Sequence, residues 1–118
     1  MIFKNIYKLI LATIVIFFVD LFWLLTGGKY ALPIAEKIQG SKISMNYYSA
    51  IFVYLFLAYM LLKTNTYSEA FLFGICIYGV YDFTTLSIFK NYDYRFAIFD
   101  TLWGGILFFV SKSIISRF

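Results

Sequence analysis

The chain contains no histidine, a single cysteine and few charged residues. The absence of histidine excludes bis-histidine haem binding, histidine-ligated metal sites and catalysis by a histidine general base. With Cys76 as the only cysteine, no disulfide can form within the chain, and we expect this residue to be a small buried hydrophobe. Charged residues make up 14% of the chain, against about 25% in soluble proteins. The chain therefore lacks the charge that a soluble surface needs.

Hydrophobic residues, in contrast, make up 63% of the 118 residues, and aromatic residues make up 24%. A fold of this size cannot bury so much apolar surface, so the expected solvent is a lipid bilayer. The net charge of +4 is spread over loops and chain ends without a basic run. This distribution favours a membrane surface over nucleic acid as partner, because anionic headgroups attract the same residues.

Four apolar segments are long enough to cross a bilayer as helices, since about 20 residues match ~30 Å of hydrocarbon. They are too long, and alternate too little, for a transmembrane barrel. We therefore predict a single all-α domain over residues 1–118, an integral membrane four-helix bundle of up-down-up-down topology. A short interfacial helix between Pro33 and Gly40, or a plain loop, is expected after the first span. The predicted spans are residues 6–27, 45–63, 68–89 and 94–114.

The orientation of this bundle is weakly determined. Lys and Arg residues divide evenly between its two sides, so the positive-inside rule does not decide. The short basic N-terminus favours both termini in the cytoplasm. The sequence does not indicate which membrane holds the protein.

Three aspartates interrupt the apolar segments: Asp20, Asp82 and Asp100. Ionisable residues within spans are costly and mark functional sites by default. Counted from the ends of their predicted spans, all three lie at a similar depth, roughly 10 Å below the surface opposite the termini. Arg95, one turn before Asp100, is expected to compensate part of their charge. The sequence thus predicts one carboxylate site near one membrane surface.

Aromatic and polar side chains are expected around these acids. Trp23 and Trp103 each follow an aspartate by one helical turn, so each indole N–H can bond a carboxylate on a facing helix. The repeated Asp-x-x-Trp is either an inverted repeat or a coincidence. Small residues at Ala70/Gly74 and Thr101/Gly105 allow close helix packing. The full set expected to bind or relay protons is Asp20, Asp82, Asp100, Trp23, Trp103, Tyr81, Tyr78, Thr85 and Asn46.

Three functions remain open at this point. The leading hypothesis is binding or passage of a cation or proton at the aspartates; hard cations such as magnesium or calcium favour such oxygens, but no metal is assigned. The first alternative is a non-catalytic structural or accessory subunit of a larger membrane complex, or a homo-oligomer. The second is a lipid-modifying enzyme, which is less favoured because no nucleophile–histidine pair or phosphate-binding glycine loop is present. No cofactor is expected.

Three motifs surround the acids: Asp20-Leu21-Phe22-Trp23-Leu24, Tyr81-Asp82-Phe83-Thr84-Thr85-Leu86 and Asp100-Thr101-Leu102-Trp103-Gly104. They resemble the motifs of a known family. Their order and spacing are similar to those in the small predicted membrane proteins of the domain-of-unknown-function family numbered 2177. The resemblance implies four spans and the same acids, and it brings no activity because the family is uncharacterised. Two departures are Thr85, where the family has Asn, and Tyr92-Asp93, where Trp-Pro is common.

Overall fold

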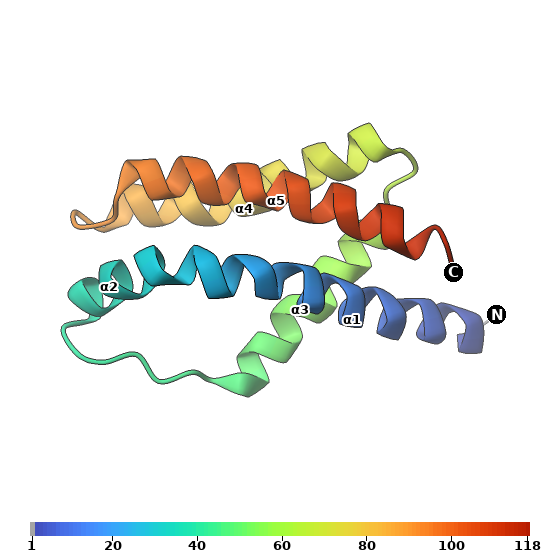
Figure 1. The fold of residues 1–118 in the computed structure, drawn as a ribbon, viewed down its shortest axis with the longest axis horizontal. Coiled ribbons are helices and arrows are strands. Elements are labelled where there is room, and N and C mark those ends of the chain that lie inside the picture. Colours follow the sequence, from blue (N-terminus) through green and yellow to red (C-terminus); the bar gives the residue numbers. More distant parts are fainter. Residues whose placement is uncertain (1) are drawn as a thin grey trace.

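A computed structural model describes the backbone of residues 2–118 and the side chains of residues 5–118. The described residues form five helices and no strand, which confirms the predicted all-α class (Figure 1). The helices are α1 (Ile2–Thr26), α2 (Gly28–Gln39), α3 (Tyr47–Leu62), α4 (Tyr67–Ile88) and α5 (Tyr94–Ile115).

Three of these helices are long and apolar enough to cross a membrane, namely α1 over Asn5–Thr26, α4 and α5. The remaining apolar helix, α3, has 16 residues. At ~1.5 Å per residue it spans about 24 Å, which is short of the ~30 Å hydrocarbon core. The second predicted span, residues 45–63, is therefore the shortest, and the complete four-span bundle stays a prediction.

Helix α5 packs most extensively against α4 and also contacts α1, and α1 in turn contacts α3 and α2. The α4–α5 pair is antiparallel, and α3 runs obliquely to α1 (Figure 1). Both chain ends lie at one end of the molecule. The α4–α5 turn and α2 lie at the other end (Figure 1).

Helix α2 begins earlier than the sequence predicted. Pro33 lies inside this helix and does not start it, whereas Gly40 ends it as expected, with φ of 80°. The reason is Gly27, which keeps a right-handed helical backbone (φ −71°, ψ −26°). Its N–H bonds the carbonyl of Trp23, so the chain bends after α1 without leaving helical conformation. A helix is thus present in this connection and begins at Gly28, whereas its position at the membrane interface stays a prediction.

Side-chain caps start helices α3, α4 and α5. Asn46 accepts from the backbone N–H of Ser49 at the start of α3, and Thr66 accepts from the N–H of Glu69 at the start of α4. Asp93 accepts from the N–H of Arg95 at the start of α5. Each cap satisfies an N–H that has no partner within its helix. Asn46, predicted as a site residue, is therefore an exposed helix cap.

The α4–α5 contact is built from glycines. A Cβ on Gly74 would collide with the carbonyl of Gly104, and one on Gly104 would lie 2.5 Å from the Gly74 carbonyl oxygen. Gly105 faces Phe71 and Ile75, whose side chains would lie 2.8 and 2.9 Å from an added Cβ. Backbone contact of this kind is typical of membrane helices, where small residues allow close approach. The predicted role of Gly74 and Gly105 is confirmed, and Gly104 completes the contact.

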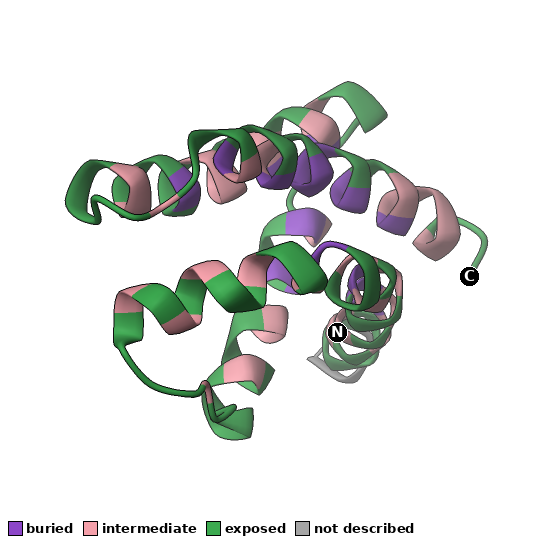
Figure 2. Cartoon of the chain, turned by 60° about the vertical axis from the view of Figure 1, so that its left-hand side comes forward, coloured by how far each residue is buried: buried purple, intermediate pink, exposed green. Residues whose placement is uncertain are grey.

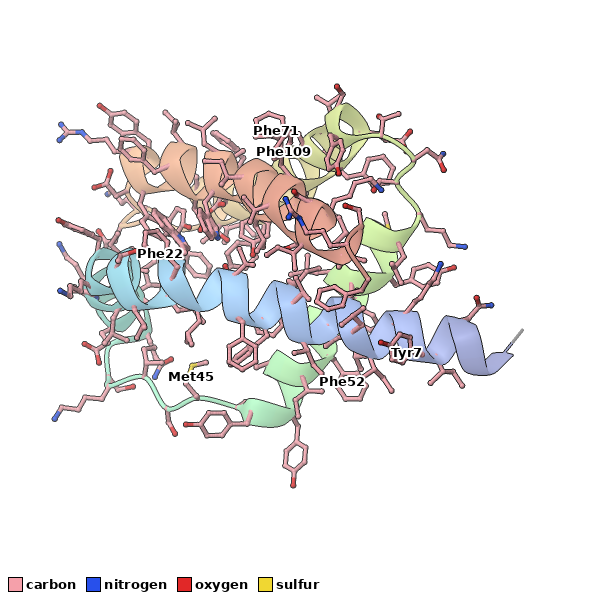
Figure 3. All side chains as sticks on the ribbon, turned by 45° about the vertical axis from the view of Figure 1, so that its right-hand side comes forward. Tyr7, Phe22, Met45, Phe52, Phe71 and Phe109 are labelled. Carbon is pink, nitrogen blue, oxygen red and sulfur yellow. The ribbon has the colours of Figure 1, made fainter. Side chains whose placement is uncertain are left out.

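The core follows α5 and continues onto α1 and α3. Its buried side chains include Leu107, Phe108, Ile16 and Leu61, each at most 1% exposed (Figure 2). Much of the outer surface is apolar: the side chains of Phe22 and Phe52, labelled in Figure 3, are 63% and 55% exposed. A surface of this kind fits lipid and not water.

Cys76 is part of this outer surface. It is exposed on α4, so the expectation that it is buried is wrong. An apolar span residue can face lipid as readily as it faces the core, and sequence alone does not distinguish the two sides of α4.

Candidate carboxylate site

The three aspartates come from three different helices and are all buried. Asp20 on α1, Asp82 on α4 and Asp100 on α5 are 5%, 0% and 8% exposed. They lie toward the end of the bundle that holds α2 and the α4–α5 turn. An aspartate is rarely buried to this degree unless its oxygens have partners.

Asp20 and Asp100 are joined by a reciprocal pair of indole hydrogen bonds. Trp103 on α5 donates its Nε1–H to Oδ1 of Asp20 on α1, at 2.8 Å. Trp23 on α1 donates its Nε1–H to Oδ1 of Asp100 on α5, also at 2.8 Å. Because α1 and α5 are antiparallel, the residue one turn after an aspartate on one helix faces the aspartate of the other. The indole–carboxylate contacts expected from the sequence are therefore present.

The two indoles also stack on each other between the acids. Their ring centroids are 5.7 Å apart and their planes differ by 16°. Trp23 stacks in turn on Phe96, with centroids 6.2 Å apart. Stacked aromatic rings fix the directions of the two N–H groups.

Asp20 has a second donor on α3. The hydroxyl of Tyr54 donates to Oδ2 of Asp20 at 2.6 Å. Both oxygens of Asp20 therefore accept bonds from neutral donors, and these bonds connect α1, α3 and α5. Sequence reasoning did not include Tyr54, although a hydroxyl in the middle of an apolar span requires a polar partner.

A residue of the α4–α5 turn binds Asp82. The hydroxyl of Tyr92 donates to Oδ1 of Asp82 at 2.5 Å. Burial, followed by this bond to Asp82, raises the pKa of the Tyr92 hydroxyl well above its ordinary value, so it stays a donor at neutral pH. Tyr92 is one of the two departures from the family pattern, and here it supplies the contact to an acid.

The other oxygen of Asp82 has no such donor. Oδ2 of Asp82 and Oγ1 of Thr101 are both buried, and neither has a hydrogen-bond partner among the described residues. The Asp82 carboxyl faces the Asp100 carboxyl and the Thr101 hydroxyl across the α4–α5 contact. A carboxylate is only an acceptor, so two facing carboxyl groups have no hydrogen bond between them unless one carries a proton.

All the hydrogen-bond donors to the three aspartates described above are neutral groups. Every donor named above is an indole N–H or a phenol O–H. Arg95, expected to compensate Asp100, is exposed and lies over the ring of Tyr94, with its guanidinium carbon 5.7 Å from the ring centroid.

A pocket of about 250 Å³ reaches this network from the side of α2. One wall is formed by α1 and α2 and consists of Asp20, Trp23, Leu24, Gly28, Ala31 and Ala35. The opposite wall consists of Tyr78, Tyr81, Tyr92, Phe96 and Asp100. The lining thus combines two acids, five aromatic rings and three small residues of α2.

The remaining residues predicted for the site divide into two groups. Tyr78 and Tyr81 line the pocket, and Tyr81 is 66% exposed at its edge. The hydroxyl of Thr85 bonds the carbonyl of Tyr81 in its own helix and does not reach an acid. Thr85 stands where the family has Asn, and this departure therefore leaves the described carboxylate bonds untouched.

The acids do not converge on one point. Within the described part of the chain, no three His, Cys, Asp or Glu side chains are grouped closely enough to hold a metal ion. The contacts instead separate Asp20 from the Asp82–Asp100 pair, with the stacked indoles between them. The cluster is therefore a hydrogen-bonded network with an adjacent pocket.

Comparison with known proteins identifies one family. The family model described as "Predicted membrane protein (DUF2177)" matches residues 5–116, which include all five helices except the first residues of α1. This is the family that the sequence motifs resemble. No curated protein and no solved structure matches the chain.

Proposed function

Because this chain belongs to the family of predicted membrane proteins described as DUF2177, we propose that it is a multi-pass membrane protein whose three aspartates bind a proton or a small cation. The observation that carries the proposal is the fully buried Asp82, whose Oδ2 has no hydrogen-bond donor among the described residues and whose carboxyl faces Asp100. A proton or a cation would supply the missing partner.

The charge balance supports the same conclusion. Moving one carboxylate out of water into a low-dielectric interior costs several kcal/mol even after relaxation. Three such groups share one small region, and their donors are neutral indole and phenol groups. Positive charge therefore has to come from bound protons or from a bound cation.

The pocket gives the ligand access from one side. Its lining includes Asp20 and Asp100, and Asp82 lies behind Asp100. Toward the termini, the bundle is filled by Leu107, Phe108 and other apolar core residues. At that far end Lys112 also donates to the carbonyl and hydroxyl of Thr64, at 2.8 and 3.1 Å. This arrangement favours binding and exchange on the α2 side over passage through the bundle.

Infrared difference spectroscopy of lipid-reconstituted protein tests the proposal. A change of pH or of cation concentration is expected to change a carboxyl absorption, and Asp82→Asn or Asp100→Asn should remove that change. Asp93→Asn is the matched control, because Asp93 is an exposed cap and Asn caps helices equally well. Identical spectra for the wild type, Asp82→Asn and Asp100→Asn would sink the proposal.

The same variants address the structural alternative. If the acids only fix helix packing, the Asn variants retain the fold and the wild type shows no ligand-dependent carboxyl signal. An accessory subunit would instead co-purify with a larger assembly in mild detergent. The buried network can support packing in either case, so the ligand-dependent signal is the deciding measurement.

A further inference from the structure

We infer that the pocket beside Asp20 and Asp100 binds a small alkylated ammonium ion, of the tetramethylammonium or choline type. This inference rests on the proposed function and names a ligand class for the part of the site that Asp20 and Asp100 line; Asp82 does not line the pocket. The pocket holds about 250 Å³. That equals roughly eight waters at ~30 Å³ each, which is room for a small organic cation and less than drug-sized ligands occupy.

Aromatic rings make up much of the pocket lining. Tyr78, Tyr81, Tyr92 and Phe96 line the space between α2 and α4–α5. Trp23 also lines it, but this ring already stacks on Trp103 and Phe96. Aromatic faces attract cations within about 6 Å of the ring centroid, and cages of such rings recognise alkylated ammonium groups. A bare metal ion would instead require several convergent oxygens, and no three His, Cys, Asp or Glu side chains are grouped in this way in the described part of the chain.

Most of the oxygens of Asp20 and Asp100 already accept hydrogen bonds. Both oxygens of Asp20 already accept bonds, from Trp103 and Tyr54. Oδ1 of Asp100 accepts from Trp23, and the Asp100 carboxyl also faces Asp82. Three of the four carboxylate oxygens of Asp20 and Asp100 thus already accept a hydrogen bond, and only Oδ2 of Asp100 has no donor among the described residues. These acids can therefore supply negative charge to the pocket while offering one free oxygen. An ammonium group without N–H donors fits this situation better than a primary amine or a hydrated metal ion.

The wall of the pocket that α2 forms consists of small residues. Gly28, Ala31 and Ala35 face the rings from the opposite wall, at spacings of about one helical turn. A Cβ added to Gly28 would meet nothing within 4 Å. All residues of α2 are described, and none of them is buried. This helix therefore leaves space beside the acids where larger side chains would fill it.

Isothermal titration calorimetry on the full chain tests the inference, in a maltoside detergent without choline headgroups. Tetramethylammonium chloride is expected to bind, and methylammonium and sodium chloride to bind at least several-fold more weakly. Tyr81→Leu should weaken tetramethylammonium binding between about two- and thirty-fold, the range of one cation–π contact. Tyr81→Phe, which keeps the ring, should bind as the wild type does. Because Tyr81 is 66% exposed, neither substitution disturbs the core.

Ala31→Leu provides a second variant that leaves the carboxylate bonds intact. It fills the pocket from α2 and is expected to abolish binding of tetramethylammonium. The inference is overturned if the wild type does not bind tetramethylammonium, or if Tyr81→Leu and Ala31→Leu bind it unchanged. If the carboxyl infrared signal persists while tetramethylammonium fails to bind, only this ligand assignment falls. Loss of both signals removes the proposed function as well.

Two further arms identify the source of the cation. A neighbouring groove shares Trp23 and Phe96 with the pocket and is also lined by Lys29 and Arg95. If the ligand is the choline headgroup of a lipid, its phosphate is expected near these two bases, and Lys29→Gln with Arg95→Gln should weaken retention of phosphatidylcholine from mixed vesicles. If the ligand is a free cation, the same double variant should leave tetramethylammonium binding unchanged.

Discussion

Small residues close the space between α4 and α5 but leave space beside α2. Toward α4, Gly74 and Gly104 bring the two backbones into contact, and an added Cβ on either would overlap a neighbouring atom. Toward α2, Gly28, Ala31 and Ala35 face a pocket of about 250 Å³. The first arrangement leaves no space and the second preserves it.

This difference shows where the molecule is fixed and where it can accept a ligand. Close packing of α4 on α5 holds Asp82 against Asp100, because both acids project from that rigid pair. Helix α2, described in full, has no buried residue and ends at Gly40. Elements with little buried surface open at low free energy, so α2 is the expected entrance.

Substituting Gly104 by alanine should produce the largest effect. The new Cβ would lie 2.5 Å from the Gly74 carbonyl oxygen and 2.5 Å from Cγ of Tyr78, so α4 and α5 must separate. We expect a loss of about 3 kcal/mol in the free energy of unfolding, visible as a lower midpoint in thermal unfolding in detergent. Gly79→Ala is the control, because its Cβ would meet Thr101 at an ordinary 3.5 Å. Similar midpoints for the two variants would contradict the close contact.

The two reciprocal indole hydrogen bonds should contribute differently to the free energy of unfolding. Trp103 is 9% exposed and Trp23 only partly buried, although each donates one bond of 2.8 Å. Trp103→Phe leaves Asp20 with a buried unpaired acceptor and is expected to cost about 2–3 kcal/mol of stability. Trp23→Phe should cost roughly 1 kcal/mol, because water from the pocket can replace its N–H. Chemical denaturation of both variants measures the difference. Equal losses of stability would contradict this prediction and show that the two indole–carboxylate bonds are equivalent.

The bend after α1 should respond to a single methyl group. A Cβ on Gly27 would lie 2.6 Å from the Trp23 ring, which must then move away from Asp100. Gly27→Ala is expected to lower stability by about 1 kcal/mol and to shift the Asp100 carboxyl resonance in NMR spectra. Gly28→Ala, one residue later, meets nothing within 4 Å and should leave that resonance in place. An unchanged resonance in Gly27→Ala would show that Trp23 is not held by this glycine.

Filling the pocket should have the smallest effect on stability. Ala35 is exposed on α2 and lines the pocket, so Ala35→Leu adds apolar volume without displacing a packed group. We expect a change within about 0.5 kcal/mol in either direction, measured by thermal unfolding beside Gly104→Ala. A large loss would mean that α2 packs as tightly as α4 does.

The sequence predicted the parts of this site that follow from helical register alone. Asp20, Trp23, Asp100 and Trp103 could be paired because the residue one turn after each acid on an antiparallel helix faces the other acid. The close packing at Gly74 was also predictable, since its small size in an apolar span has one common purpose.

Other contacts depend on side-chain length and loop path, which register does not determine. Tyr54 reaches Asp20 from an oblique helix, and Tyr92 reaches Asp82 from a turn. Asn46 was assigned to the site because of its depth, but an Asn before an apolar run also caps a helix, and that role prevailed. The early start of α2 was missed because Gly27 adopts a helical backbone although glycine commonly ends helices.

The stacking of Trp23 on Trp103 has an optical consequence. These are the only two tryptophans of the chain, and their planes differ by 16° at a centroid distance of 5.7 Å. All tryptophan fluorescence of the protein therefore originates beside its buried acids, and the two coupled indoles form a chiral chromophore pair with its own circular dichroism. The unlabelled protein thus contains an intrinsic spectroscopic reporter, which can follow protonation, occupancy and helix movement at these acids in a native membrane.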